Sequence, residues 1–295
     1  MAKRKQADDD DSHIDSDSGS DVSIVNVDFD FFSPNPDVDY HAINKLLRQL
    51  FQRDTENLNT NQLTELILAQ TSIGTTVKTD GQESDPYALL TVLNMHLHHQ
   101  HLSVKAIANY CLEKVAASGD QAFHNTLHAL FSQNQQHVGL VICERLINMP
   151  VQVIPPMYKM LADELRQAIS NNEPYNFSHF LFISRTYHLT PEEESFLANS
   201  ASRNSNKAKS PKKSRTTSSQ PEPEPPVDGI YSFHPEDEAI RALSLHTLDY
   251  KYTNAPTEPR EKDAFGLDVR ARMMLLPAEN FQALVDKLQE VYTVI

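Results

Sequence analysis

Aspartates at alternating positions stand out in the stretch SIVNVDFDFFSP, which spans Ser23 to Pro34. If this stretch is a strand, its valines and phenylalanines share one face, and Asp28 and Asp30 share the other, about 7 Å apart. The alternative is that these two aspartates only protect an edge strand from pairing with other chains. Acidic clusters attract cationic partners. We expect the following carboxylates to form a surface for a basic partner protein: Asp8, Asp9, Asp10, Asp11, Asp28, Asp30, Asp37 and Asp39.

Histidines and cysteines could provide metal or nucleophile chemistry, but their spacing argues against both. The stretch NMHLHHQHL places His96 and His98 on one face of a strand end, and two further ligands are not evident. We therefore expect no metal site, and a polar strand end running into a loop. Cys111 and Cys143 lack the C-x-x-C spacing of a zinc knuckle. Cys143 lies among apolar residues that predict a buried helix, so we expect a structural thiol and no catalytic residue.

The charged neighbours of Cys143 are Glu144 and Arg145. We interpret them as members of structural ion pairs that anchor the predicted helix.

Phosphate-binding loops require closely spaced glycines, and the chain has only seven glycines, none in a G-x-G pattern. The stretch QHVGLV, Gln136 to Val141, partly matches the pyrophosphate loop of GNAT acyltransferases. Val141 stands where that loop has glycine or alanine, and a branched side chain would crowd the phosphates. We favour an ordinary helix start at Gly139 and expect no cofactor. An acyltransferase that uses acetyl coenzyme A stays open as the alternative.

Two basic clusters have the density of nuclear-localisation signals. Acid-directed kinases would find aspartate three residues after Ser12 and after Ser18. We expect phosphorylation at these two serines and entry into the nucleus, with shuttling to the cytoplasm. The basic residues are Lys3, Arg4 and Lys5, and Lys209, Lys212, Lys213 and Arg215.

The charge of the chain favours a basic partner over bare nucleic acid. The 295 residues carry a formal net charge of −14, and 39% of them are apolar. Residues 1–30 hold nine acidic and three basic residues, and residues 199–228 hold three acidic and six basic, which leaves −11 for the remainder. Phosphates would be repelled by such a body. No apolar run approaches the length of a membrane span or a signal peptide, so we expect neither secretion nor membrane insertion.

Composition divides the chain into one folded domain and two disordered segments. Residues 1–22 form an acidic, serine-rich tail, and residues 199–228 are first basic and then rich in proline and glutamate. We expect a single α/β (α+β) domain from residues 23–198 and 229–295. Apolar periodicity predicts helices over residues 40–50, 104–116, 121–131, 139–148, 156–170 and 278–292. Strands are expected over 75–78, 88–93, 178–189, 241–253 and 267–276, the second buried on both faces and central.

Several long blocks of this sequence resemble the BCCIP family of eukaryotic nuclear proteins, whose fungal members are called Bcp. The blocks are VNVDFDFFSPNPDVDYHAINKLLRQLF, VKTDGQESDPYALLTVLN, GLVICERLINMPVQVIPPMYKML and FLFISRTYHL. The resemblance implies a GNAT-like domain with a central mixed sheet that has lost its cofactor site. It further implies a non-enzymatic chaperone for a basic large-subunit ribosomal protein of the L-fourteen type, which supports ribosome biogenesis. Family members are also linked to import and export machinery and to nuclear export of a phosphatidylinositol phosphate kinase.

Overall fold

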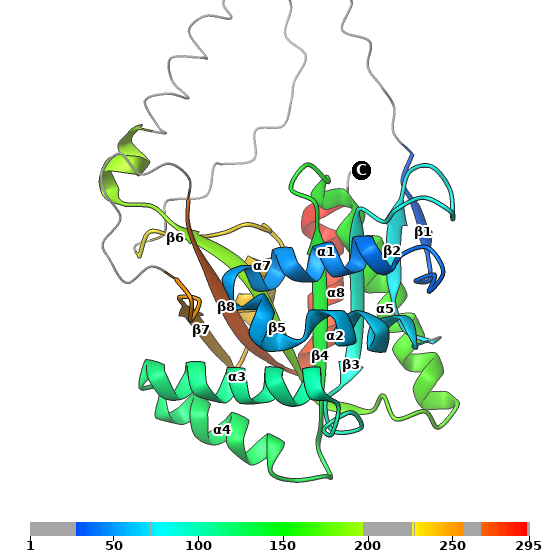
Figure 1. The fold of residues 1–295 in the computed structure, drawn as a ribbon, viewed down its shortest axis with the longest axis horizontal. Helices are drawn as coiled ribbons and strands as arrows, with labels where there is room; N and C mark the ends of the chain where they lie inside the picture. Colours follow the sequence, from blue (N-terminus) through cyan, green and yellow to red (C-terminus); the bar gives the residue numbers. More distant parts are fainter. Residues whose placement is uncertain (1–27, 71, 197–225, 227, 256–266, 294–295) are drawn as a thin grey trace, which may run out of the picture.

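One mixed sheet organises the chain. The computed structural model describes residues 28–70, 72–196, 226, 228–255 and 267–293. Within them, eight strands follow the order β1-β2-β3-β4-β5-β8-β7, and β6 pairs with β5 (Figure 1). The strands are β1 (Asp30–Phe32), β2 (Thr75–Lys78), β3 (Ala88–Asn94), β4 (His137–Arg145), β5 (Phe177–His188), β6 (Ile230–Ser232), β7 (His246–Tyr250) and β8 (Asp268–Pro277).

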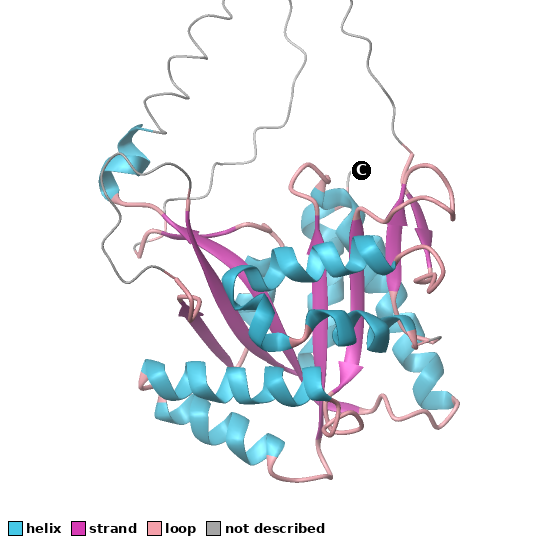
Figure 2. Cartoon of the chain, in the orientation of Figure 1, coloured by secondary structure: helices cyan, strands magenta, loops and turns pink. Residues whose placement is uncertain are grey.

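Helices cover both faces of the sheet, as Figure 2 shows. One apolar core lies beneath α1 (Tyr40–Phe51), α2 (Thr60–Leu68), α3 (Leu102–Ser118) and α4 (Gln121–Phe131). The second lies beneath α5 (Ile154–Ser170), α7 (Asp237–Leu243) and α8 (Phe281–Tyr292). The 3-10 turns are η1 (Gln52–Leu58), η2 (Val151–Val153) and η3 (Ala278–Asn280). The expected mixed sheet flanked by helices is confirmed. None of the described helices could span a membrane.

The central strand β3 explains why this sheet separates two cores. All of its residues are buried. Leu89 and Leu93 enter the core beneath α1–α4, whereas Leu90 and Val92 enter the other. Successive side chains of a strand point to opposite faces, so an apolar run without alternation fits a strand covered on both sides. The prediction of a central strand here is confirmed.

The parallel pair β4 and β5 separates partway along its length. The two strands pair from His137 to Val141 and from Phe177 to Phe182. Beyond these residues β4 continues to Arg145 and β5 to His188, and Figure 1 shows the strands diverging upward from a shared lower end. At Thr186–His188, β6 pairs with β5 in place of β4. We call the wedge between residues 142–145 and 183–185 the strand gap.

Two sequence predictions need correction, and helix α2 has no counterpart among the predictions. Residues 139–148 were expected to be helical, but 137–145 form strand β4, and Gly139 lies within it. A Cβ atom at Gly139 would lie 2.7 Å from Cγ2 of Val92, so the close approach of β3 accounts for this glycine. Residues 241–243, expected in a strand, end helix α7. Almost all of the predicted segments 1–22 and 199–228 lie outside the described residues, so their disorder stays a prediction.

Candidate functional site

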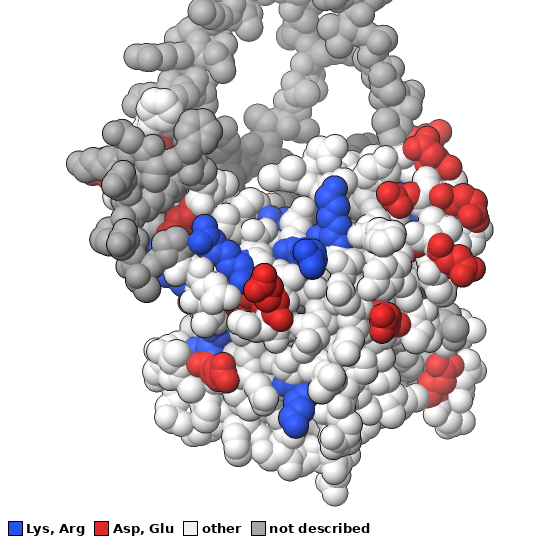
Figure 3. All heavy atoms as spheres, viewed as in Figure 1, with Lys and Arg blue, Asp and Glu red and all other residues white. Residues whose placement is uncertain are grey.

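Exposed carboxylates gather where β1 meets the loop between β2 and β3. Strand β1 pairs with β2, with Asp30 opposite Lys78, so Asp28 and Asp30 lie beside the loop that follows β2. That loop, residues 79–87, adds three exposed acids. Figure 3 shows this concentration of acidic side chains at the upper right. We use the term acidic surface for six exposed carboxylates, those of Asp28, Asp30, Asp37, Asp80, Glu83 and Asp85.

The charge of the acidic surface is not neutralised by the part of the chain that the structure describes. Among the residues that the structure describes, none of its six carboxylates makes an ion pair. The hydrogen bonds around it are local, such as the one from the Thr79 hydroxyl to Asp80 Oδ2 at 3.0 Å. Like charges held together without counter-ions produce a negative potential outside the protein. This surface is therefore suited to a cationic partner.

The predicted alternation around Asp28 and Asp30 is present in the described part of that stretch. Phe29 and Phe31 pack against the core beneath α5, while both aspartates are exposed. Strand β1 is also an edge strand of the sheet. The same carboxylates are thus placed both to receive a partner and to discourage strand pairing.

Asp39 does not belong to the acidic surface, contrary to the sequence prediction. Its side chain is fully buried, and Oδ1 lies 2.6 Å from Nζ of Lys78, which is also fully buried. The Asn35 amide donates to its other oxygen at 2.8 Å, and Lys78 donates to the Gln82 carbonyl at 2.6 Å. Asp39 therefore ties the start of α1 to β2 and to the acidic loop. It supports the acidic surface from below, and its side chain is not accessible from outside.

The remaining predicted site residues lie outside the described part of the chain. These are the carboxylates Asp8, Asp9, Asp10 and Asp11, the serines Ser12 and Ser18, and the basic residues Lys3, Arg4, Lys5, Lys209, Lys212, Lys213 and Arg215. Their roles stay predictions. Conversely, Asp80, Glu83 and Asp85 were missed. The signal was available, because three acids surround Gly81 in the predicted turn.

An exposed apolar side chain borders the acidic surface. The Leu146 amide donates to the Tyr87 carbonyl at 2.9 Å, which continues the pairing of β3 with β4 beyond the strand ends. Continued by one residue, this register places Ile147 opposite Pro86, next to Asp85 of the loop between β2 and β3. Ile147 is 77% exposed. A large apolar side chain at such an edge can anchor a partner that the charges attract.

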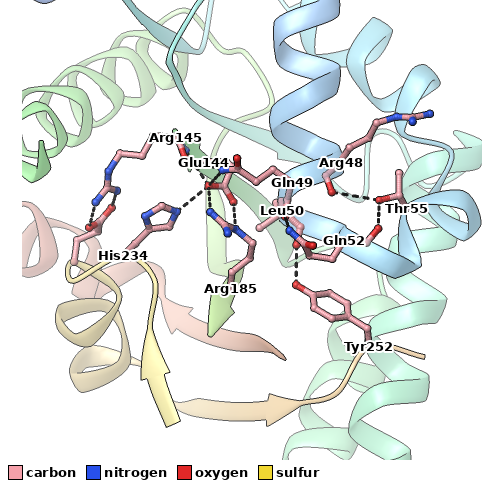
Figure 4. Close-up of polar contacts among 11 residues, drawn as sticks. Arg48, Gln49, Leu50, Gln52, Thr55, Glu144, Arg145, Arg185, His234 and Tyr252 are labelled. Carbon is pink, nitrogen blue, oxygen red and sulfur yellow. Dashed lines mark hydrogen bonds and ion pairs between the residues drawn. The ribbon is translucent and has the colours of Figure 1, made fainter. Parts of the chain in front are cut away.

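The strand gap is filled by a buried ionic network centred on Glu144 (Figure 4). Arg185 donates two hydrogen bonds to this carboxylate, both at 2.9 Å, and His234 Nε2 lies 2.8 Å from it. Gln49 of α1 donates to it as well, at 2.9 Å. Burial opposes ionisation of Glu144, but the hydrogen bonds from His234 and Arg185 outweigh it and lower the pKa to about 2.

A second ion pair closes the gap on the other face of the sheet. Arg145 pairs with Glu236, and one of the two contacts is 3.0 Å long. His234 and Glu236 both belong to the segment between β6 and α7, so this short segment bridges the two diverging strands. The predicted structural ion pairs at Glu144 and Arg145 are present, although they anchor a strand and not a helix.

The structure removes the basis of the predicted alternatives at Cys143 and at QHVGLV. Residues 137–141 of the latter form the first half of β4, where 138–141 are buried, so they do not form a phosphate-binding loop. Cys143 lies in the same strand, and burial raises the pKa of its thiol well above the usual range. A protonated thiol is a poor nucleophile. The acyltransferase interpretation depended on QHVGLV alone and thereby loses its pyrophosphate loop.

The histidine-rich stretch forms a turn after β3, as the loop interpretation predicted. His96 stacks on His137 with ring centroids 5.0 Å apart, and its Nε2 lies 3.0 Å from the Leu130 carbonyl. Burial lowers the pKa of His96. Within the described ranges, no three histidine, cysteine or acidic side chains are placed to hold a metal ion. His96 therefore has a structural role, in which it joins the turn after β3 to β4 and to the end of α4.

Comparison with known proteins fits this architecture. A sequence profile of the BCCIP family matches residues 24–240. The chain belongs to the BCCIP family. Among its relatives, protein bcp1 of Schizosaccharomyces pombe is 41% identical over an alignment of 277 positions that covers 92% of each chain. Protein bcp1 of Emericella nidulans is 40% identical, with 98% of each chain aligned. The names of these family members are not names of enzymes.

A solved structure supports the fold of this BCCIP-family protein. The crystal structure of BCP1 from Saccharomyces cerevisiae is similar with a TM-score of 0.59 and 26% sequence identity. The alignment covers 92% of this chain and 91% of that one. The sheet and its helices are thus shared across nearly the whole length of the two proteins.

Proposed function

We propose that this BCCIP-family protein is a non-enzymatic nuclear chaperone that binds a lysine- and arginine-rich client through the acidic surface. The observation that carries the proposal is the set of six exposed carboxylates with no ion pair among the described residues. The body of the chain is itself strongly acidic, at −11 without residues 1–30 and 199–228. Such a surface masks the cationic side chains of a client that is not yet bound to RNA.

Charged and apolar contacts affect different rates in this mechanism, the rate of association and the rate of dissociation. Complementary potentials steer the encounter and raise the association rate, whereas packed apolar contacts lengthen the lifetime of a complex. The acidic surface provides the first, and Ile147 at its border provides the second. Screening by salt limits the steering to short range, since the Debye length is about 8 Å at physiological ionic strength. The complex therefore forms most rapidly at low salt.

The client we propose is a basic large-subunit ribosomal protein of the L-fourteen type, as the family resemblance implies. An RNA-binding protein of this kind exposes cations that capture any polyanion when it is free. Escort by an acidic chaperone supports ribosome biogenesis because it keeps the client soluble. We further propose that the basic clusters direct the protein into the nucleus, that it shuttles with the cytoplasm, and that it binds import and export machinery and a phosphatidylinositol phosphate kinase.

The test measures how the acidic surface affects association with the purified client. Asp28, Asp30, Asp80 and Asp85 are replaced together with asparagine, and association is followed by stopped flow from low to physiological salt. We expect the association rate at low salt to fall at least about tenfold and its salt dependence to flatten. The Ile147→Ser variant should mainly accelerate dissociation.

A control variant carries Glu65→Gln and Glu113→Gln, which removes exposed acids from α2 and α3, away from the surface. It should associate nearly as fast as the natural protein. An unchanged rate in the fourfold variant would assign Asp28 and Asp30 to protection of the edge strand. Failure of the natural protein to keep the client soluble at low salt would reject the chaperone function itself.

A further inference from the structure

A polar groove with a volume of about 530 Å³ lies where η1 joins α1 to α2. Its walls include Arg48 near the end of α1, Arg53 and Glu56 of η1, and Thr60, Asn61 and Gln62 in the first turn of α2. Figure 4 shows the Arg48 side chain directed away from the network around Glu144. The groove lies on the sheet face covered by α1–α4, so it is separate from the acidic surface along the β1 edge.

Both arginines of the groove have unpaired side chains among the described residues. Within the described part of the chain, neither guanidinium group makes an ion pair or a hydrogen bond. The adjacent carboxylate of Asp54 is buried and already committed, because Lys114 Nζ lies 3.7 Å away and the Thr253 amide donates to it at 2.8 Å. In a chain with a net charge of −14, two unpaired guanidinium groups on one hollow create a local positive site.

The backbone of the same groove adds hydrogen-bond donors. The three α2 residues that line it form the first turn of the helix, and no side chain caps that turn. Asn59, which precedes them, has a left-handed backbone with φ of 50°. The first amides of a helix have no acceptor within the helix and favour negative groups. These donors support the arginines but would not form a site without them.

We propose that this groove binds the phosphate group of a phosphorylated serine or threonine in a partner protein. A phosphoserine carries a charge of about −1.5 to −2 near neutral pH and three acceptor oxygens, which match the forked donors of arginine. An extended polyanion such as RNA would be repelled by the acidic body, whereas a single phosphate reaches the groove without placing further charges against it. The carboxylate of Glu56 in the wall repels the phosphate and lowers the affinity, so its removal should raise the affinity.

The binding experiment uses a short neutral peptide that contains one phosphoserine and one tryptophan. The chain itself has no tryptophan, so the fluorescence anisotropy of the peptide reports binding directly. We expect saturable binding of the phosphopeptide. Control peptides that carry serine or glutamate in place of phosphoserine should bind much more weakly. Replacing both Arg48 and Arg53 with alanine should weaken binding at least about tenfold, since two charge-assisted contacts are lost. Glu56→Gln should strengthen it about two- to fivefold.

The control is Lys159→Ala, which removes an exposed cation of α5 on the opposite face of the sheet and should leave affinity unchanged. Urea unfolding of each variant checks that the fold is intact. If the double arginine variant does not fold, the increase in Glu56→Gln still decides the question. The proposal is overturned by absence of saturable binding, by equal binding of the glutamate peptide, or by equal weakening in Lys159→Ala. Tighter binding of a single-stranded oligonucleotide through the same arginines would assign the groove to nucleic acid instead.

Discussion

Replacing Glu144 with glutamine removes the negative charge on which Arg185 and His234 converge, while the side chain keeps its size and part of its hydrogen bonding. Arg185 would then remain buried without a counter-charge. Removal of one partner from a buried ion pair costs about 3–5 kcal/mol of unfolding free energy. The lowering of the Glu144 pKa from 4.5 to about 2 leads to a similar figure, about 3 kcal/mol. We expect Glu144→Gln to lower the free energy of unfolding by about this amount at pH 7.

The pH dependence of stability gives a second readout with a definite sign. Because the folded-state pKa of Glu144 is lowered, its contribution is complete above pH 4.5 and is lost as the pH falls toward about 2. Over that interval the free energy of unfolding of the natural protein should fall by about 3 kcal/mol, a contribution that is absent from the Glu144→Gln variant at every pH. The free energy of unfolding of the two proteins should therefore converge in acid.

Urea denaturation, followed by far-UV circular dichroism from pH 7 downward, measures both effects. Glu83→Gln removes an exposed acid that makes no ion pair with any described residue, and it serves as the matched control, with an expected change below about 0.5 kcal/mol. The reasoning would be refuted by a loss below about 1 kcal/mol at pH 7, or by parallel acid dependence of the two proteins. Either result would mean that the network at the strand gap adds little to the stability of the fold.

Two further substitutions probe the supports of the sheet. Asp39→Asn should lower the free energy of unfolding in urea by about 3–5 kcal/mol, because it leaves the fully buried Lys78 without a counter-charge. The control Asp37→Asn, at an exposed position, should be nearly neutral. Equal effects of the two substitutions would contradict the buried pair of Asp39 with Lys78. Gly139→Ala should lower the free energy of unfolding by about 1–3 kcal/mol, because the added methyl group would lie 2.7 Å from Cγ2 of Val92. Adding Val92→Ala in the same chain should restore part of this free energy. A double variant no more stable than Gly139→Ala would contradict the contact.

Amphipathic periodicity made most of the helices predictable. Helix α1 buries Ile43, Leu47 and Leu50 at helical spacing, and α4 begins and ends at the predicted residues. Strand β4 was misread because it is buried on both faces, so its sequence lacks the alternation that identifies a strand. A short apolar run of this kind is equally compatible with a buried helix. The positions on which the strand gap depends were therefore assigned to the wrong element.

The candidate site was predictable only in part, because burial of a charge depends on contacts that are distant in sequence. Asp28, Asp30 and Asp37 are exposed as expected. Asp39 is also an aspartate with similar neighbours in the sequence, but its side chain is buried because the fold brings Lys78 to within 2.6 Å of it. The divergence of β4 from β5 has no local sequence signature at all. It follows from the segment between β6 and α7, whose His234 and Glu236 enter the space between the strands.

The pairing of β5 has a consequence for how the polypeptide can be divided. Residues up to 196 provide β1–β5, and residues from 226 onward provide β6, β7 and β8. Strand β8 pairs with β5 from His179 to His188, and its central residues are fully buried in both cores. Without the residues from 226 onward, one edge of β5 would therefore have no pairing strand, and both apolar cores would lose the buried side chains of β8.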